Sequence, residues 1–246
     1  MARIPKISTT KVHRFVLSYF VRRGGRRYAY VLFFGDSNTY GFDPESRAAG
    51  TGERFPAAVR WCGVTAHELG SSGHVIEEGL NGRTTVHEDP YRLTTHLSGG
   101  ALLPTLLKSH LPLDVVVIML GTNDLKPVYS LGLADIARGM AVLAEAVREF
   151  PWPSCAPCPQ ILLVSPPPLT DAATCGLLAE FDARGVALSK QLADAYAGVA
   201  ELEGCDFLDA GKVTKVGDFD GVHLDAAGHH ALGLAVAAKV QEMADR

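Results

Sequence analysis

The sequence lacks any apolar run that is long enough to cross a lipid bilayer. A membrane-spanning helix needs about 20 consecutive apolar residues, whereas the longest runs here, Asp114–Leu120 and Ile161–Ser165, have the length of a β-strand. Cysteine is also scarce, because the chain of 246 residues contains only five, an odd number. A sparse and odd set does not suggest a disulfide framework, so we expect a reduced, cytoplasmic setting.

The common signatures of cofactor and metal sites are missing as well. No G-x-G-x-x-G follows the first apolar run, and the chain contains no P-loop. The histidines lack a metal-ligand spacing such as H-E-x-x-H. We therefore expect neither a cofactor nor a metal. The G-x-S-x-G elbow of α/β-hydrolases is absent too.

Acidic residues are absent from the first 30 positions, which carry eight basic residues. Since the whole chain has a net charge of −4, residues 31–246 carry −12. An acidic body of this kind repels nucleic acid, so no nucleic-acid partner is expected. The basic segment has the composition of a targeting sequence, and Phe15–Val21 would let it contact an anionic membrane. The simplest alternative is a poorly ordered extension or a start codon assigned too early. We predict such an extension at 1–29 and one domain at 30–246.

Short apolar runs without alternation predict the fold class. Runs of this kind are typical of strands that helices cover on both faces. The predicted strands are Tyr30–Phe34, His74–Glu78, Asp114–Leu120, Gln160–Ser165 and Cys205–Asp209. Helical patterns lie between them, at Pro56–Leu69, Leu102–Ser109, Leu133–Val147, Ala173–Ala200 and Ala226–Met243. The alternation predicts an α/β fold, a three-layer α/β/α sandwich around a flavodoxin-like five-stranded parallel sheet.

Polar motifs follow three of the predicted strands, where ligands bind in such sheets. Gly35–Gly41 places Ser37 at a strand-to-helix turn, Gly79–Thr85 contains Gly82, and Gly121–Asp124 contains Asn123. A serine in such a turn is exposed, glycine permits a close backbone approach, and Asn123 offers a side-chain amide to an oxyanion. Each motif taken alone also fits an ordinary turn or helix cap.

A fourth motif, Asp220–Asp225, precedes the last predicted helix. His223 has the chemistry to move a proton near neutral pH, and Asp220, three residues earlier, is placed to orient its ring. The alternative is a surface histidine beside a helix that Asp225 caps.

The four motifs in this order resemble the SGNH (GDSL-type) hydrolases, from about Tyr30 to the C-terminus. Further segments are similar to the bacterial arylesterase/acyltransferase branch: Val75–Leu80, Arg83–Thr85, Leu111–Asp114, Met119–Asp124 and Val164–Leu169. The resemblance implies hydrolysis of short-chain aryl and alkyl esters, with water or an alcohol as acyl acceptor. It also implies an assembly of several copies of the chain.

The resemblance also assigns roles to individual residues. Ser37 is the expected nucleophile, His223 the general base and Asp220 the residue that orients it. The expected oxyanion hole consists of the backbone N–H groups of Ser37 and Gly82 and the side chain of Asn123.

Five further residues are weaker candidates for the substrate pocket. Close relatives often carry an apolar residue and a tryptophan where this chain has Asn38 and Tyr40, which predicts a more polar pocket mouth and weaker acyl transfer. Phe42 is expected at the entrance unless it only packs, and Arg83 at the site unless it is a solvated surface residue. Pro166 is expected in the pocket wall unless it only stiffens a loop.

Two other functions fit the same sequence less well. One is removal of O-acetyl groups from carbohydrates by the same three residues, because substrate choice depends on loops 43–55 and 86–99, whose path the sequence does not reveal. The other is a non-catalytic flavodoxin-like module in which Gly35–Thr39 cradles a phosphate. That reading leaves Asn123, Asp220 and His223 without a role.

Overall fold

The computed structural model describes residues 29–154, 156–175 and 179–246. The basic extension predicted at 1–29 lies outside the described residues except for Ala29, which begins the first strand. Its proposed roles are therefore not tested.

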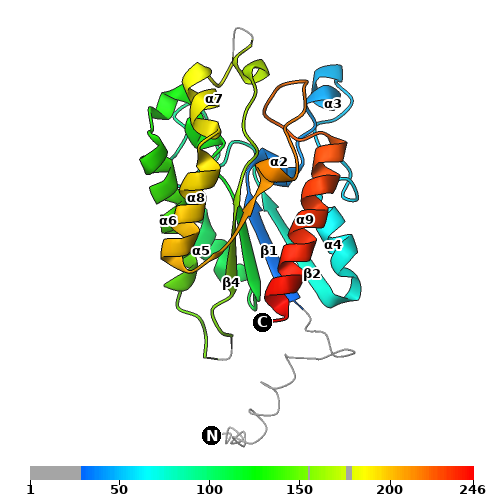
Figure 1. The fold of residues 1–246 in the computed structure, drawn as a ribbon, viewed down its shortest axis with the longest axis vertical. Helices are drawn as coiled ribbons and strands as arrows, with labels where there is room; N and C mark the ends of the chain where they lie inside the picture. The colour runs from blue at the N-terminus through cyan, green and yellow to red at the C-terminus, as the bar shows by residue number, and fades with distance from the viewer. Residues whose placement is uncertain (1–28, 155, 176–178) are drawn as a thin grey trace, which may run out of the picture.

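The described residues form one sheet of five parallel strands in the order β2-β1-β3-β4-β5 (Figure 1). The strands are β1 Ala29–Gly35, β2 Gly73–Gly79, β3 Val115–Met119, β4 Gln160–Ser165 and β5 Asp206–Asp209. The predicted flavodoxin-like order is confirmed, and every predicted strand is present within two residues of its expected bounds.

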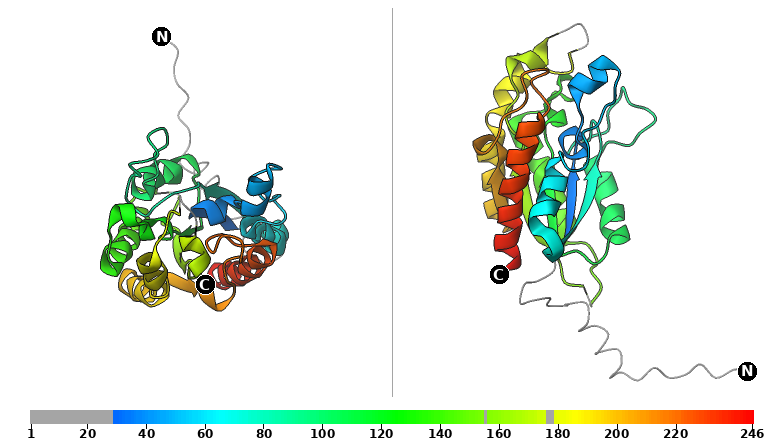
Figure 2. Two further views of the ribbon diagram at one scale, coloured as in Figure 1. Left: turned by 90° about the horizontal axis from the view of Figure 1, so that it is seen from above. Right: turned by 90° about the vertical axis from the view of Figure 1, so that its right-hand side faces the viewer.

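Helices cover both faces of the sheet, which explains the unbroken apolar character of the strands (Figure 2). Leu32, Phe34 and Ile118 point toward the layer of α5 Gly99–Ser109, α6 Leu133–Arg148 and α8 Leu192–Glu203. Val31, Phe33 and Val117 point the other way, toward α4 Trp61–Leu69 and α9 Ala226–Ala244. Successive side chains of one strand therefore enter two separate hydrophobic clusters.

Two of the predicted helices differ from their expected bounds by more than three residues. The helix expected at 56–69 begins only at Trp61. The helix expected at 173–200 is divided into η4 Asp171–Thr174, α7 Ala183–Ser189 and α8. Asp182 starts α7 by accepting a hydrogen bond from the backbone N–H of Gly185 at 2.7 Å, so a local cap overrides the continuous apolar pattern.

Short elements lie around the carboxyl ends of the strands, where α2 Ser37–Tyr40 and α3 Pro44–Ala49 follow β1 (Figure 1). The remaining short helices are η1 Gly70–Ser72, η2 Asn123–Leu125, η3 Pro127–Tyr129 and η5 Ala210–Lys212. Ala29 and the last turn of α9 line one small hollow at the opposite edge of the sheet. Within the described residues, no helix is both long enough and apolar enough to span a membrane.

Candidate active site

Ser37 occupies the first position of α2, directly after the central strand β1. Asp36 caps this helix, because its Oδ1 accepts a hydrogen bond from the backbone N–H of Asn38 at 2.9 Å. As the first residue of the helix, Ser37 has no intrahelical acceptor for its backbone N–H. The turn thus directs both the hydroxyl and the N–H of Ser37 to the carboxyl edge of the sheet.

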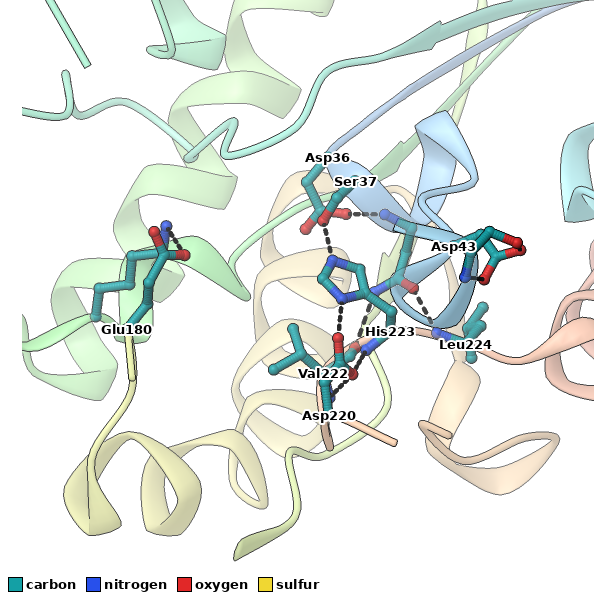
Figure 3. A network of polar contacts seen from close by, with 11 residues as sticks. Asp36, Ser37, Asp43, Glu180, Asp220, Val222, His223 and Leu224 are labelled. Carbon is teal, nitrogen blue, oxygen red and sulfur yellow. Dashed lines mark hydrogen bonds and ion pairs between the residues drawn. The ribbon is translucent and has the colours of Figure 1, made fainter. Parts of the chain in front are cut away.

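A chain of hydrogen bonds joins Ser37 to two residues from the other end of the sequence (Figure 3). Ser37 Oγ lies 2.9 Å from His223 Nε2, and His223 Nδ1 lies 2.6 Å from Asp220 Oδ2. A carboxylate only accepts hydrogen bonds, so Nδ1 carries the proton and Nε2 is left to accept from the serine hydroxyl. This is the arrangement in which a serine can lose its proton to a histidine.

The spacing of Asp220 and His223 follows from a tight turn. Asp220 Oδ1 accepts from the backbone N–H groups of Val222 and His223, each at 2.9 Å. Gly221 has a φ of 69°, which favours glycine, and a Cβ there would overlap Thr170. Burial opposes ionisation of Asp220, but the hydrogen bonds and charge of His223 and the two N–H groups lower its pKa. Asp220 is therefore held as an anion beside the ring.

The three predicted oxyanion donors line the same cleft as His223. Gly82 has a φ of 86°, which requires glycine. Asn123 donates one amide hydrogen to the backbone oxygen of Arg83 at 3.0 Å and retains a second. Asp124 secures the loop that carries Gly82, because it accepts from Thr85 N at 3.0 Å and from the Thr85 hydroxyl. The structure brings these donors together, and their role stays a prediction.

The cleft has a volume of about 530 Å³ and contains both apolar and charged side chains. Its apolar members include Phe42, whose ring lies 4.6 Å from the His223 ring, and Phe181. Besides Asp220, its charged members form two ion pairs, Arg47 with Glu53 at 3.4 Å and Arg92 with Glu180 at 3.3 Å.

Of the five weaker pocket candidates, only Phe42 lines the cleft. Asn38 is buried and bonded to the segment around His223. Tyr40 lies beneath the Arg54 guanidinium, 4.3 Å from ring centroid to Cζ. Each residue of a helix is rotated by about 100° from the last, so residues that follow Ser37 in α2 point elsewhere. These two side chains therefore lie outside the cleft lining, and the expected polar pocket mouth stays a prediction.

Arg83 and Pro166 also lie outside the cleft lining. Arg83 is only 3% exposed and lies neither in the cleft nor in solvent. Its guanidinium donates to the backbone oxygens of Gly35 and Glu78 and stacks 4.3 Å from the Phe34 ring. It thereby joins the carboxyl ends of β1 and β2, and burial lowers its pKa to about 10. Pro166 is buried after β4 and does not line the cleft.

Sequence reasoning missed two buried groups beside the site. Asp36 is 2% exposed, and burial raises its pKa to about 6, against the effects of the Asn38 N–H and of the charges on His223 and Arg83. His229 on α9 is fully buried, accepts from the backbone N–H of Trp61 at 3.3 Å, and has a pKa lowered by burial to about 4. Neither residue has a sequence signal beyond its place in a motif or helix.

The charged pair of Arg92 and Glu180 was also missed. Arg92 belongs to the loop between β2 and α5, and Glu180 precedes α7. Lys126, only 5% exposed, holds Glu180 from the other side at 2.8 Å. No cluster of three histidine, cysteine or acidic side chains suited to a metal ion is present in the described part of the chain.

The model of the GDSL-like Lipase/Acylhydrolase family matches residues 33–231. A carbohydrate acetylesterase family member from Sinorhizobium meliloti is 41% identical, with a TM-score of 0.81, and the match covers 89% of this chain and 100% of that one. The aryl esterase of M. smegmatis is 39% identical over 87% of this chain and 99% of that one, with a TM-score of 0.81. A putative arylesterase from Agrobacterium tumefaciens is 39% identical over the same shares, with a TM-score of 0.79. No curated protein matches the chain.

Proposed function

Because this chain belongs to the GDSL-like lipase/acylhydrolase family and is a carboxylic-ester hydrolase, we propose that Ser37, His223 and Asp220 form its catalytic triad. The resemblance to SGNH hydrolases expected from the four motifs is confirmed by these matches. The observation that carries the proposal is the continuous hydrogen-bonded chain from Ser37 Oγ through His223 to Asp220 at the cleft.

The proposed reaction proceeds in two halves. Ser37 Oγ attacks the ester carbonyl carbon while its proton passes to His223 Nε2, and the carbonyl electron pair moves onto oxygen. This oxyanion receives hydrogen bonds from Ser37 N, Gly82 N and Asn123 Nδ2, each typically worth about 3–4 kcal/mol in the transition state. His223 then returns the proton to the departing alcohol, which leaves an acyl-serine. Water repeats the sequence and releases the acid.

A short acyl group is the proposed preference. A cleft of about 530 Å³ has to hold the acyl group and the alcohol together, and Arg47, Glu53, Arg92 and Glu180 share its lining. A long alkyl chain would cover these charged groups and remove their water, which is costly. An aryl or small alkyl ester fits against Phe42 and Phe181 without this cost.

Removal of acetyl groups from carbohydrates is the second candidate. The four charged side chains named above offer donors and acceptors to sugar hydroxyl groups, and one similar structure is that of a carbohydrate acetylesterase family member. The values of kcat/KM for acetylated xylose and for p-nitrophenyl acetate distinguish deacetylation of carbohydrates from hydrolysis of aryl or alkyl esters. A clear preference for the sugar ester would replace the proposed aryl or alkyl ester.

Acyl transfer to alcohols, self-association and a cytoplasmic setting remain predictions. The argument for weak transfer loses its basis, because Asn38 and Tyr40 do not line the cleft. The ratio of ester to acid formed in water with added alcohol measures transfer directly. Light scattering that gives only the chain mass of 26.2 kDa would refute self-association.

The first experiment measures hydrolysis of p-nitrophenyl acetate, butyrate and octanoate by the wild type, Ser37→Ala and Ser109→Ala. Ser109 is an exposed serine at the end of α5 and serves as the matched control. We expect Ser37→Ala to lose at least about a thousandfold in kcat while Ser109→Ala keeps the wild-type rate. The wild-type rate should fall from acetate to octanoate. Full activity of Ser37→Ala would refute the proposed nucleophile.

A further inference from the structure

Asn38 connects the helix of Ser37 to the segment that carries His223. Its Nδ2 donates to the backbone oxygen of Val222 at 3.2 Å, and its Oδ1 accepts from the backbone N–H of Leu224 at 2.8 Å. Figure 3 shows Val222 and Leu224 on either side of His223. The amide is 2% exposed and lies outside the cleft lining, so it is not placed to touch substrate.

The segment from Asp220 to Leu224 has no regular secondary structure to hold it. Hydrogen bonds from several groups fix it instead, among them one from Thr170 N to Gly221 O at 3.1 Å. Asp220 binds the N–H groups of Val222 and His223, Gly217 N donates to His223 O at 2.7 Å, and Asn38 binds Val222 and Leu224. Of these groups, Asn38 is the one that joins the segment to the element that bears Ser37.

The anchor itself is firmly placed. Helix α2 is closed at its start by Asp36, which accepts from Asn38 N, and at its end by Gly41, whose N–H donates to Ser37 O at 2.8 Å. Asn38 follows Ser37 directly, so nucleophile and anchor share one rigid turn. The separation of Ser37 Oγ and His223 Nε2 therefore depends on the reach of the Asn38 side chain.

We propose that Asn38 is a positioning residue, which holds His223 in line with Ser37 through the peptide groups on both sides of the histidine. An amide is suited to this task, because it donates with nitrogen and accepts with oxygen. Leucine at this position offers neither function, and aspartate offers only the acceptor. The inference rests on the proposed roles of Ser37 and His223.

The test compares Asn38→Leu and Asn38→Asp with wild type and with Thr65→Val. Thr65 is the control, because like Asn38 it is a buried polar residue that joins two elements by hydrogen bonds. Its hydroxyl lies 2.9 Å from both Trp61 O and Gly233 O, so it joins α4 to α9 away from the cleft. Three quantities are measured: kcat and KM for p-nitrophenyl acetate, the rate of inactivation by a p-nitrophenyl alkylphosphonate, and the midpoint of thermal unfolding. In the inactivation, Ser37 Oγ bonds to phosphorus, p-nitrophenolate leaves and His223 accepts the serine proton.

We expect Asn38→Leu to lower both kcat and the rate of phosphonylation by about tenfold to hundredfold, because a small misplacement of the base is enough for such losses. KM should stay within about twofold, since no substrate contact is removed. Asn38→Asp should recover part of the rate through its remaining acceptor. Thr65→Val should unfold at a lower temperature with kcat unchanged.

Two results would overturn the proposal. Asn38→Leu with wild-type kcat and phosphonylation would show a purely structural residue, and a raised KM at unchanged kcat would show a substrate contact. If Asn38→Leu does not fold, Asn38→Asp, which has nearly the same side-chain volume, provides the test. Wild-type kcat and phosphonylation rates in Asn38→Asp would also refute the positioning role of Asn38. A wild type inactive on esters and phosphonate contradicts the proposed function instead.

Discussion

Replacing Asp36 by asparagine isolates the effect of one buried carboxyl group. Asp36 lies beside Ser37 with 2% exposure, and burial raises its pKa from the ordinary 3.8 to about 6. Between these values the native protein keeps a proton that the unfolded chain has lost. The stability associated with this proton is complete below 3.8 and is lost as pH rises through about 6.

The difference between the two pKa values corresponds to about 3 kcal/mol. Asparagine carries no charge and keeps an oxygen that can accept from the Asn38 N–H. We therefore expect Asp36→Asn to match wild type near about pH 4 and to exceed it by up to about 3 kcal/mol near pH 8. The variant should also have a lower kcat, because the charge of Asp36 favours the imidazolium of His223.

Urea unfolding between about pH 4 and pH 8 measures the difference in the free energy of unfolding between wild type and Asp36→Asn directly. Asp218→Asn is the control, because the Asp218 side chain is 91% exposed and its removal should leave the pH dependence unchanged. A stability gain in Asp36→Asn that is constant with pH, or that shrinks as pH rises, would refute the argument.

Three further variants test other parts of the structure. His229→Gln should gain up to about 3 kcal/mol relative to wild type as pH falls from 6.5 to about 4, because only the unfolded wild type binds a proton in that range; urea unfolding with no such gain would contradict a buried neutral histidine. Gly82→Ala should cost about 1–3 kcal/mol, because its φ is 86°, and should lower kcat about tenfold, because relief of that strain moves the N–H of residue 82; urea unfolding without a loss of stability would contradict the strain. Asp124→Ala should cost about 1–3 kcal/mol, because the buried N–H of Thr85 loses its acceptor; unchanged stability would show that this contact is dispensable.

The sheet and the four motifs were predictable because both depend on local sequence. Strands covered on two faces must be apolar throughout, and β1 and β3 are. Three of the motifs follow strand ends, so a parallel sheet necessarily brings these three to one edge. Ser37, Gly82 and Asn123 therefore meet in the structure as the sequence predicted.

The remaining features depend on contacts between distant segments. The direction of Asn38 follows from its rotation in α2 and from partners 184 and 186 residues away in the chain. Arg83 carries a charge that favours the surface, yet the carbonyl groups of Gly35 and Glu78 hold it inside. Arg92 and Glu180 meet across two loops whose lengths do not determine their paths. Such contacts are set by tertiary structure and leave no periodic signal in the sequence.

The position of the chain ends in the described fold bears on how the protein can be attached to a solid support. Ala29 and the last turn of α9 lie together at the edge of the sheet opposite to α2 and the cleft (Figure 1). A coupling tag that follows α9 would therefore attach the protein through the edge of the sheet opposite to the cleft, with Ser37 directed toward the bulk solution. Ester and product would diffuse freely to and from a surface-bound layer, without a blocked cleft.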